Sequence, residues 1–279
     1  MSTAFVKMQG LGNDFVVFDG VSQPLTLTAE QVRWIANRRQ GIGCDQVLLV
    51  APSDSDTADF SYRIWNADGT EVEHCGNGVR CVGRFLHDQQ LSDKPTMTLA
   101  TAAGLTRVTP RSDGMVEVDM GAPILTPAAI PFHRAAQAPL YPLNVAGHDY
   151  AIGAVSMGNP HAVLAVDSVA TAPVNELGAA IEAHPDFPNH VNAGFMQIID
   201  RGNIRLRVFE RGVGETPACG TGACAAVVCG IINGWLDQSV VVALTGGELV
   251  IHWPGDQASV WMTGPATTVF EGRLAAGAL

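Results

Sequence analysis

The chain carries the same pattern twice, and this internal repeat constrains the fold more than any other feature. Residues 61–79 read SYRIWNADGTEVEHCGNGV, and residues 205–223 read RLRVFERGVGETPACGTGA. Aligned, the two segments superimpose one Cys-Gly-x-Gly motif on the other, with the cysteines at positions 75 and 219, and the upstream arginines and glutamates also coincide. Because a sequence repeat reflects a repeated structural unit, we expect two homologous domains.

Two further landmarks occur upstream in the same order. Gly12-Asn13 precedes one apolar run and Gly158-Asn159 precedes another, while Gln46 enters the run VLLV and Asn192 enters AGFMQII. We therefore predict two domains that face each other across a pseudo-two-fold axis, with the active site in the cleft between them. The first comprises residues 1–120 with about 266–279 and carries Cys75; the second comprises residues 121–265 and carries Cys219. The boundary is placed at the Gly121-Ala122-Pro123 turn.

Composition excludes several classes of protein. A length of 279 residues with 47% hydrophobic and 15% charged residues is typical of two packed domains rather than a disordered chain. The net charge of −11, with scattered basic residues, argues against a nucleic-acid or anionic-membrane surface. No signal peptide is recognisable, and the most apolar stretch, residues 223–232, is about half as long as a membrane span. We expect a soluble, cytoplasmic protein.

The six cysteines are expected to be reduced thiols. No CxxC pair is present, and the spacings Cys75–Cys81 and Cys219–Cys224 do not fit a zinc ribbon, so we expect no metal. Cysteines outside the repeated motif have no matching context in the other half, and we interpret them as packing residues: Cys44, Cys81, Cys224 and Cys229.

Each repeated motif is predicted to run from strand through glycine-rich loop and cysteine into a helix. Strands are indicated at residues 63–66 and 205–210, and helices at 79–87 and 223–232. A helix N-terminus has unsatisfied N–H groups and a partial positive charge, so a thiol there ionises more easily and a carboxylate can bind. The motif thus combines a base with an anion site.

Two such cysteines suit inversion of a stereocentre. One thiolate removes the Cα proton from one face while a thiol returns a proton to the other, and the pair titrates as a unit. Backbone N–H groups aimed at the α-carboxylate would stabilise the carbanion without pyridoxal phosphate or another cofactor.

Polar residues at matching positions in the two halves are candidate ligands. Glu210 and Arg211 precede Cys219, whereas the first-half counterpart of Glu210 is Asn66, which suggests an asymmetric ligand. His161 follows Asn159-Pro160 and is a candidate for tuning a thiol. The neutral hydrogen-bonding candidates are Asn13, Gln46, Asn66, Asn159 and Asn192.

At these residues the sequence resembles diaminopimelate epimerases along nearly its whole length. The resemblance rests on both cysteine motifs in context and on the opening GNDF. The matching segments are residues 8–15 (MQGLGNDF), 44–46 (CDQ), 66–69 (NADG), 75–81 (CGNGVRC), 158–161 (GNPH), 210–216 (ERGVGET) and 218–222 (ACGTG).

The resemblance implies an α+β fold of two pseudo-symmetric domains, each a curved mixed β-sheet, roll- or barrel-like, around a central helix. It implies interconversion of LL- and meso-2,6-diaminopimelate, in the formation of lysine and of a peptidoglycan precursor, with Cys75 and Cys219 as the acid/base pair. It further implies that His161 and Glu210 influence the thiol pKa values, that the protein is a homodimer and that Phe270 lies near the dimer contact. Implied substrate-binding residues are Asn13, Gln46, Asn66, Gly76, Asn77, Asn159, Asn192, Glu210, Arg211, Gly220 and Thr221.

Other functions remain open at the level of sequence. A proline or hydroxyproline racemase of the same superfamily also uses two cysteines, but usually reads Cys-Gly-His-Gly where this chain has Asn77. A thiol–disulfide redox protein would need a pair able to bridge, and a non-catalytic binding module would need neither thiol. Residues 126–139, rich in Ala and Pro, match nothing functional, and we expect them at a surface or at the interdomain connection.

Overall fold

The chain divides into two compact units in the computed structural model, which describes residues 2–72, 76–102 and 104–279. Unit 1 comprises Met1–Val118 with Gly264–Leu279, and unit 2 comprises Asp119–Thr263. The C-terminal segment belongs to unit 1 because its strand pairs with the first strand of the chain.

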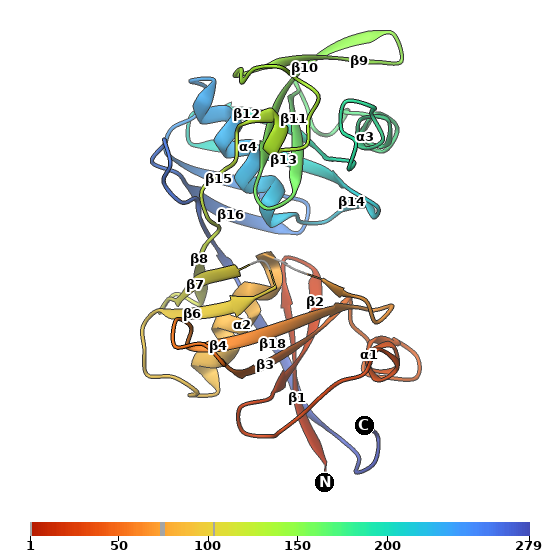
Figure 1. Cartoon of the computed structure of the whole chain (residues 1–279), viewed down its shortest axis with the longest axis vertical. Coiled ribbons are helices and arrows are strands. Elements are labelled where there is room, and N and C mark those ends of the chain that lie inside the picture. Colours follow the sequence, from red (N-terminus) through yellow and green to blue (C-terminus); the bar gives the residue numbers. More distant parts are fainter. Residues whose placement is uncertain (1, 73–75, 103) are drawn as a thin grey trace. The chain divides into compact units, whose positions relative to one another are not determined.

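Unit 1 is built on a mixed sheet, in which β2–β3 and β4–β6 are parallel and the other neighbours are antiparallel. Helices α1 (Ala29–Ala36) and α2 (Gly76–Asp88) lie in the two parallel crossovers (Figure 1), and the short β5 (Glu71–Val72) pairs with β4. Across the sheet the strands are β18 (Thr267–Leu274), β1 (Thr3–Gly10), β2 (Asn13–Asp19), β3 (Gln46–Pro52), β4 (Phe60–Asn66), β6 (Met97–Thr101), β7 (Gly104–Pro110) and β8 (Met115–Asp119).

Unit 2 repeats this arrangement with the same strand directions. Helices α3 (Val174–Glu182) and α4 (Gly220–Ile232) occupy the crossovers, β14 (Gly214–Thr216) pairs with β13, and a 3-10 turn, η1, spans Pro127–Ala129. Across the sheet the strands are β9 (Tyr141–Val145), β10 (His148–Ser156), β11 (Pro160–Ala165), β12 (Asn192–Asp200), β13 (Asn203–Glu210), β15 (Ser239–Leu244), β16 (Gly247–His252) and β17 (Trp261–Pro265).

The repeat extends to the register of the strands. Phe15 pairs with Gln46 between β2 and β3, and His161 pairs with Asn192 at the equivalent place between β11 and β12. The predicted α+β fold of two pseudo-symmetric mixed sheets is thereby confirmed. Both central helices begin three residues earlier than the sequence pattern predicted, at Gly76 and Gly220, because the glycines that follow each cysteine already belong to the first turn.

The central helices are enclosed by their sheets. Helix α4 contacts β10, β11, β12, β13 and β16, and every residue from Gly220 to Gly230 is buried, as its apolar sequence indicated. Helix α2 contacts β1, β2, β3 and β7, and its first eight residues are buried. A helix surrounded in this way has only its ends free of the sheet, so a ligand could meet it only there.

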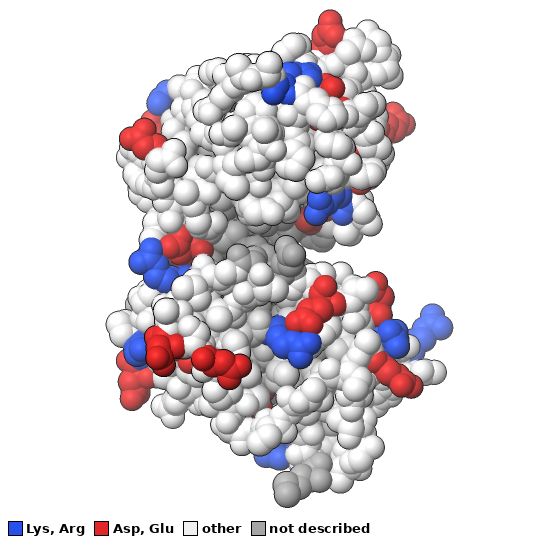
Figure 2. All heavy atoms as spheres, in the orientation of Figure 1, with Lys and Arg blue, Asp and Glu red and all other residues white. Residues whose placement is uncertain are grey.

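An ion pair is repeated at the same place in both units. Arg63 on β4 binds both carboxylate oxygens of Glu71 at 2.7 Å, and Arg207 on β13 binds those of Glu215 at 2.6 and 2.7 Å. Bidentate pairs of this kind fix the geometry of a hairpin more than they stabilise it, because both are partly exposed. On the face shown in Figure 2, basic and acidic side chains likewise occur beside one another in small groups.

Most of the Ala- and Pro-rich segment 126–139 is exposed, as expected of a surface segment, but two of its apolar side chains belong to the core of unit 2, which the sequence did not indicate. Ile130 is fully buried and Phe132 is 3% exposed. Phe132 stacks on Phe187 at 4.4 Å between ring centroids and meets Tyr141 edge-on at 5.0 Å. Two apolar residues among many small ones form no periodic pattern, so only their three-dimensional contacts reveal the packing.

Within the described part of the chain, no helix is both long enough and apolar enough to cross a membrane.

Close packing at the end of α4 predicts that Gly230→Ala destabilises unit 2. A Cβ on Gly230 would lie 2.3 Å from Cδ1 and 2.6 Å from Cγ of the buried Leu236. Although alanine favours a helix by about 1 kcal/mol, overpacking of this kind costs about 1–3 kcal/mol. We expect a lower urea midpoint for unfolding.

Gly202→Ala is the matched control, since the nearest atom to its new Cβ is Asp200 Oδ1 at 3.6 Å. Its effect should stay within about 0.5 kcal/mol. Equal stability of the Gly230→Ala variant and the unchanged protein would contradict the packing described for α4.

Candidate active site

Cys219 lies at the N-cap of α4, almost completely buried. Its Sγ donates a hydrogen bond to Oε2 of Glu210 at 3.1 Å and lies 3.6 Å from Oγ1 of Thr221. Gly222 leaves room for the Cys219 side chain beside the helix, because a Cβ at this position would lie 3.0 Å from the Val208 side chain and 3.2 Å from the Cys219 Sγ. The first turn of α4 is therefore shaped around the thiol.

The Cys219 thiol is held in its protonated form. Burial raises its pKa well above the usual value and the Glu210 carboxylate raises it further, outweighing the opposite effects of the Thr221 hydroxyl and the Gly222 N–H. The sequence expectation that a helix N-terminus makes this thiol easier to ionise is wrong for Cys219. The reason is that a short-range carboxylate and desolvation exceed the partial charge of the helix end.

Glu210, at the end of β13, is the centre of a hydrogen-bonded group. Its Oε2 accepts from Cys219, and its Oε1 accepts from the hydroxyl of Thr216 on β14. The backbone N–H of the next residue, Arg211, donates to Oδ1 of Asn192 at 2.9 Å. The guanidinium of Arg211 donates to the carbonyl of Asn189 at 3.0 Å. Sequence reasoning identified Glu210 and Arg211 but missed Thr216.

His161 and Asn159 lie beside this group on β11 and the turn before it. Asn192 donates through Nδ2 to the carbonyl of Pro160 at 2.9 Å, which ties β12 to the start of β11. Nε2 of His161 lies 3.0 Å from Oδ1 of Asn159, so the ring proton is assigned to Nε2. Burial, and to a smaller extent the charge of Arg211, lower the pKa of His161 to about 3. The imidazole is therefore neutral, and its buried Nδ1 has no hydrogen-bond partner among the described residues.

In unit 1, Gln46 and Asn66 meet across β3 and β4. They are directly paired in the strand register, and Nε2 of Gln46 donates to Oδ1 of Asn66 at 2.9 Å. Oε1 of Gln46 is buried and finds no partner within the described ranges. The register of unit 2 places Asn192 and Glu210 at the corresponding positions, since Ala193 pairs with Phe209.

Asn13 is held by a charged network that the sequence did not indicate. Its Nδ2 donates to Oδ2 of Asp45 at 3.1 Å. Arg38 binds Asp45 at 2.8 Å and Asp14 at 2.7 Å, and the buried Lys7 binds Asp14 at 2.6 Å. Burial alone would raise the pKa of Asp14, but hydrogen bonds from Arg38, Lys7 and Asp45 hold it below its usual range.

The first turn of α2 contains Gly76 and Asn77, whereas Cys75 lies outside the described residues. Asn77 is buried, and its Oδ1 accepts from Nη2 of Arg80 at 2.9 Å. Arg80 is fully buried and also donates to the carbonyls of Gly76 at 3.4 Å and Pro265 at 3.2 Å. Sequence reasoning did not predict that Arg80 holds the first turn of α2. The only signal in the sequence is that Arg80 stands where the aligned repeat has Cys224.

Within each unit, the structure thus brings together several predicted residues. In unit 2 these are Cys219, Glu210 and Thr221 by direct contact, with Gly220 in the same turn and with Asn192, Arg211, His161 and Asn159 linked to them through β11 and β12. In unit 1 they are Gln46 with Asn66, and Gly76 with Asn77, while Asn13 at the start of β2 is held by Asp45. Over the residues that the structure describes, no three His, Cys, Asp or Glu side chains form a group that could hold a metal ion.

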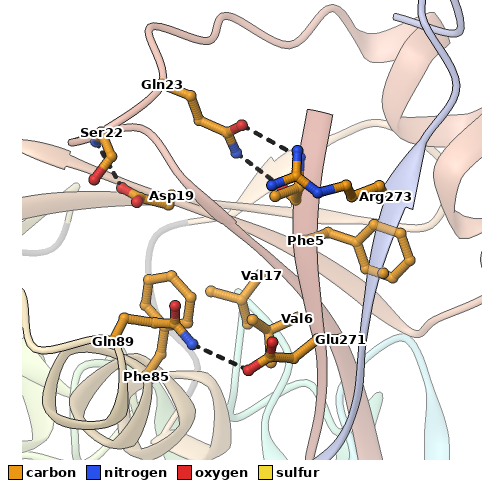
Figure 3. A pocket seen from close by; sticks show the side chains of 12 residues that line it. Phe5, Val6, Val17, Asp19, Ser22, Gln23, Phe85, Gln89, Glu271 and Arg273 are labelled. Carbon is orange, nitrogen blue, oxygen red and sulfur yellow. Dashed lines mark hydrogen bonds between the residues drawn. The ribbon is translucent and has the colours of Figure 1, made fainter. Parts of the chain in front are cut away.

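A separate pocket of about 550 Å³ lies on unit 1 and contains none of the predicted site residues. Its apolar part is formed by Phe5, Val6, Val17 and Phe85 (Figure 3). Polar residues from the end of β2 and the segment after it, from the residue that follows α2, and from β18 surround it: Asp19, Ser22, Gln23, Gln89, Glu271 and Arg273.

The low pKa of His161 predicts an acid-sensitive contribution to stability. The unfolded chain binds a proton near pH 6.5, whereas folded His161 binds one only near pH 3. The free energy of unfolding should therefore fall as the pH drops from 6.5 to 4, by about 1.4 kcal/mol per pH unit more than in the His161→Phe variant. Phenylalanine is chosen because Phe15 occupies the equivalent register position in unit 1.

His148→Phe, at an exposed strand position, controls for the loss of any imidazole. Urea unfolding at several pH values should give this control the slope of the unchanged protein. If the free energy of unfolding depends on pH in the same way in the His161→Phe variant and in the unchanged protein, His161 is not buried in its neutral form.

Comparison with known proteins covers nearly the whole chain. The sequence model of the family described as diaminopimelate epimerase matches residues 5–126 and 153–269. Diaminopimelate epimerase of Thioalkalivibrio sulfidiphilus is 60% identical over 98% of this chain and 99% of its own length. That of Halorhodospira halophila is 59% identical over 97% of this chain and 94% of its own.

Solved structures with low sequence identity share the fold. A PhzF-family phenazine biosynthesis protein of Bacillus anthracis superimposes with a TM-score of 0.70 at 18% identity, covering 99% of both chains. A hydroxyproline epimerase of Agrobacterium vitis gives a TM-score of 0.68 at 18% identity, covering 99% of this chain and 93% of its own. With the family match and the near full-length relatives, the conclusion is that this chain belongs to the diaminopimelate epimerase family.

Proposed function

We propose that the protein interconverts LL- and meso-2,6-diaminopimelate by transferring the Cα proton between two cysteines, without a cofactor. The observation that carries the proposal is the buried Cys219 thiol, held protonated at the start of α4 by Glu210, in one copy of a repeated unit whose other copy has Cys75 at the same position. Relatives that are 55–60% identical over nearly the full chain bear the name of this activity.

The proposed reaction balances one proton removed against one proton added. Cys75 as thiolate takes the Cα proton of the LL isomer, and the Cys219 thiol gives its proton to the opposite face. The thiol and thiolate exchange roles in the reverse direction. Charge that develops on the α-carboxylate would be stabilised by N–H groups of the two helix N-termini, at Gly76 and Asn77 of α2 and at Gly220 and Thr221 of α4. His161, neutral and close to Arg211, is proposed to keep the surroundings of the thiols free of an added positive charge.

The far end of the substrate is itself an amino acid, and the remaining polar residues are proposed to bind it. Gln46 contributes a buried carbonyl oxygen that suits an ammonium group. Arg211 suits the carboxylate. The further proposed contacts are Asn13, Asn66, Asn159, Asn192 and Glu210, of which Asn192 also holds the backbone of Arg211.

A proline or hydroxyproline racemase is the alternative, and the observations favour it less. Its support is a shared fold at 18–19% identity, which carries no information on substrate. Asn77 stands where such enzymes usually have histidine.

Exchange in deuterated water tests the proposal. With LL-diaminopimelate under reducing conditions, we expect deuterium at Cα of the meso product, followed by nuclear magnetic resonance and mass spectrometry. L-Proline should show no exchange. Exchange with proline and none with diaminopimelate would support the racemase alternative, and exchange with neither would refute both.

Cys75→Ala and Cys219→Ala should each lower kcat for inversion by about 100- to 10 000-fold, because one face then lacks its acid or base. Cys229→Ala, which removes a buried thiol near the other end of α4, is the control and should retain activity. Inversion at an unchanged rate in either of the first two variants would refute the two-base scheme.

We also propose a cytoplasmic homodimer that binds neither nucleic acid nor membranes. Support for the dimer comes from β18, where Val269 and Phe270 are 55% and 47% exposed and Phe270 packs edge-on against Phe5. Exposed apolar residues alone do not mark an interface, and Phe270 is chosen because the resemblance to the family implies a dimer contact near it. The net charge of −11 supports the absence of polyanionic partners.

Phe270→Glu should convert the dimer to a monomer, which light scattering after size-exclusion chromatography would measure. Ile199→Glu, which charges an equally exposed apolar residue on β12, is the control and should leave the mass unchanged. A monomeric unchanged protein, or a dimeric Phe270→Glu variant, would contradict the proposed interface.

A further inference from the structure

The carboxylate of Glu210 is held from two sides. The Cys219 thiol donates to Oε2 at 3.1 Å, and the Thr216 hydroxyl donates to Oε1. A glutamate side chain has several rotamers, so one hydrogen bond leaves its carboxylate free to swing. A second donor on the other oxygen restricts that rotation and fixes which oxygen meets the sulfur.

The β13–β14 hairpin places the hydroxyl at this position. Glu210 pairs with Gly214 and Val208 pairs with Thr216, so Thr216 is the diagonal neighbour of Glu210 on the same face. On the opposite face, Glu215 binds Arg207 through both oxygens at 2.6 and 2.7 Å. That bidentate pair fixes the register of the hairpin, and the register fixes Thr216 beside Glu210.

The equivalent hairpin of unit 1 has the same ion pair but no hydroxyl at the position of Thr216, and its Asn66 donates instead to the Thr70 hydroxyl at 3.5 Å. Arg63 binds Glu71 as Arg207 binds Glu215, and Ile64 pairs with Val72 as Val208 pairs with Thr216. Val72 therefore occupies the position of Thr216, and Asn66 occupies that of Glu210. A hydroxyl that donates to this side chain thus occurs in the half that has a carboxylate to hold, whereas the Thr70 hydroxyl accepts from the amide of Asn66, so the hairpin alone does not account for Thr216.

We propose that Thr216 is a positioning residue, whose hydroxyl fixes the Glu210 carboxylate so that Oε2 faces Cys219 and keeps that thiol a proton donor. This inference rests on the proposed two-cysteine chemistry and adds a residue to it. Without the hydroxyl, the Glu210 carboxylate is free to turn away from Cys219, which weakens its effect on the sulfur. Loss of that effect makes Cys219 easier to ionise.

The test is the pH dependence of Cys219 alkylation by iodoacetamide, resolved by fragmentation mass spectrometry in the full-length protein without substrate. In the Thr216→Val variant, the midpoint of the profile should shift down by about one pH unit, which corresponds to a tenfold change in the ionisation constant. Thr216→Ser, which restores the donor, should return the midpoint to that of the unchanged protein. If the substitution only made Cys219 more or less accessible to iodoacetamide, the alkylation rate at high pH would change and the midpoint of the pH profile would not.

Kinetics supply the second measurement. Thr216→Val should lower kcat for epimerisation by about tenfold with little change in KM, and Thr216→Ser should recover most of it. Thr109→Val is the control, because it removes a hydroxyl-to-hydroxyl hydrogen bond with Thr96 at a half-buried strand position of unit 1. Should Thr216→Val fail to fold, Thr216→Ala removes the same donor with a smaller side chain.

The possible outcomes distinguish the positioning role of Thr216 from the proposed epimerase function. A shifted midpoint with serine rescue, in a protein that does not epimerise diaminopimelate, would support the positioning role and overturn the proposed substrate. An unshifted midpoint in both the valine and alanine variants of an active epimerase, or a serine variant that behaves like valine, would overturn the role of Thr216 and leave the proposed function standing.

Discussion

The enclosure of α4 by its own sheet is the constraint on which the site depends. Because this helix is apolar on every side and buried from Gly220 to Gly230, it must lie inside the curved sheet, and only its ends are available for other tasks. Its N-terminus follows directly from the β13–β14 hairpin, so the residue at the N-cap is brought against the end of β13. That arrangement places Cys219 beside Glu210 and at the same time buries the thiol, while Glu210 stays half-buried.

The two units share a scaffold and differ at a few positions that matter chemically. Strand order, direction and register are the same, down to the arginine–glutamate pair that fixes each hairpin. Charge is distributed differently. Unit 2 has a carboxylate and a hydroxyl where unit 1 has an amide and an apolar side chain, and unit 1 has a buried guanidinium on α2 where unit 2 has a thiol on α4. The pairs are Glu210 and Asn66, Thr216 and Val72, Arg80 and Cys224, and His161 and Phe15. A duplicated scaffold thus provides two matched cysteine positions, the proposed acid/base pair, and local substitutions make their surroundings unequal.

The repeat made the two-unit architecture predictable from sequence, since matched motifs imply matched structures and the strand pattern around each motif was clear. The identity of the polar candidates followed from the same alignment. Three features depend on contacts distant in sequence and could not be predicted: the raised pKa of Cys219, the network that holds Asn13, and the burial of Phe132. The first was predicted in the wrong direction because a helix N-terminus is visible in sequence, whereas burial and a carboxylate nine residues upstream at 3.1 Å are not. The placement of the two thiols relative to one carbon remains a prediction.

The pairing of β18 with β1 has a consequence for synthesis on the ribosome. Unit 2 is continuous in sequence, so it can fold as soon as its last strand has emerged. Unit 1 begins first but needs residues 267–274 for its edge strand, and this long-range pairing closes a loop that contains all of unit 2. The nascent chain therefore completes its second unit before its first, and β1 stays without this neighbour for most of translation.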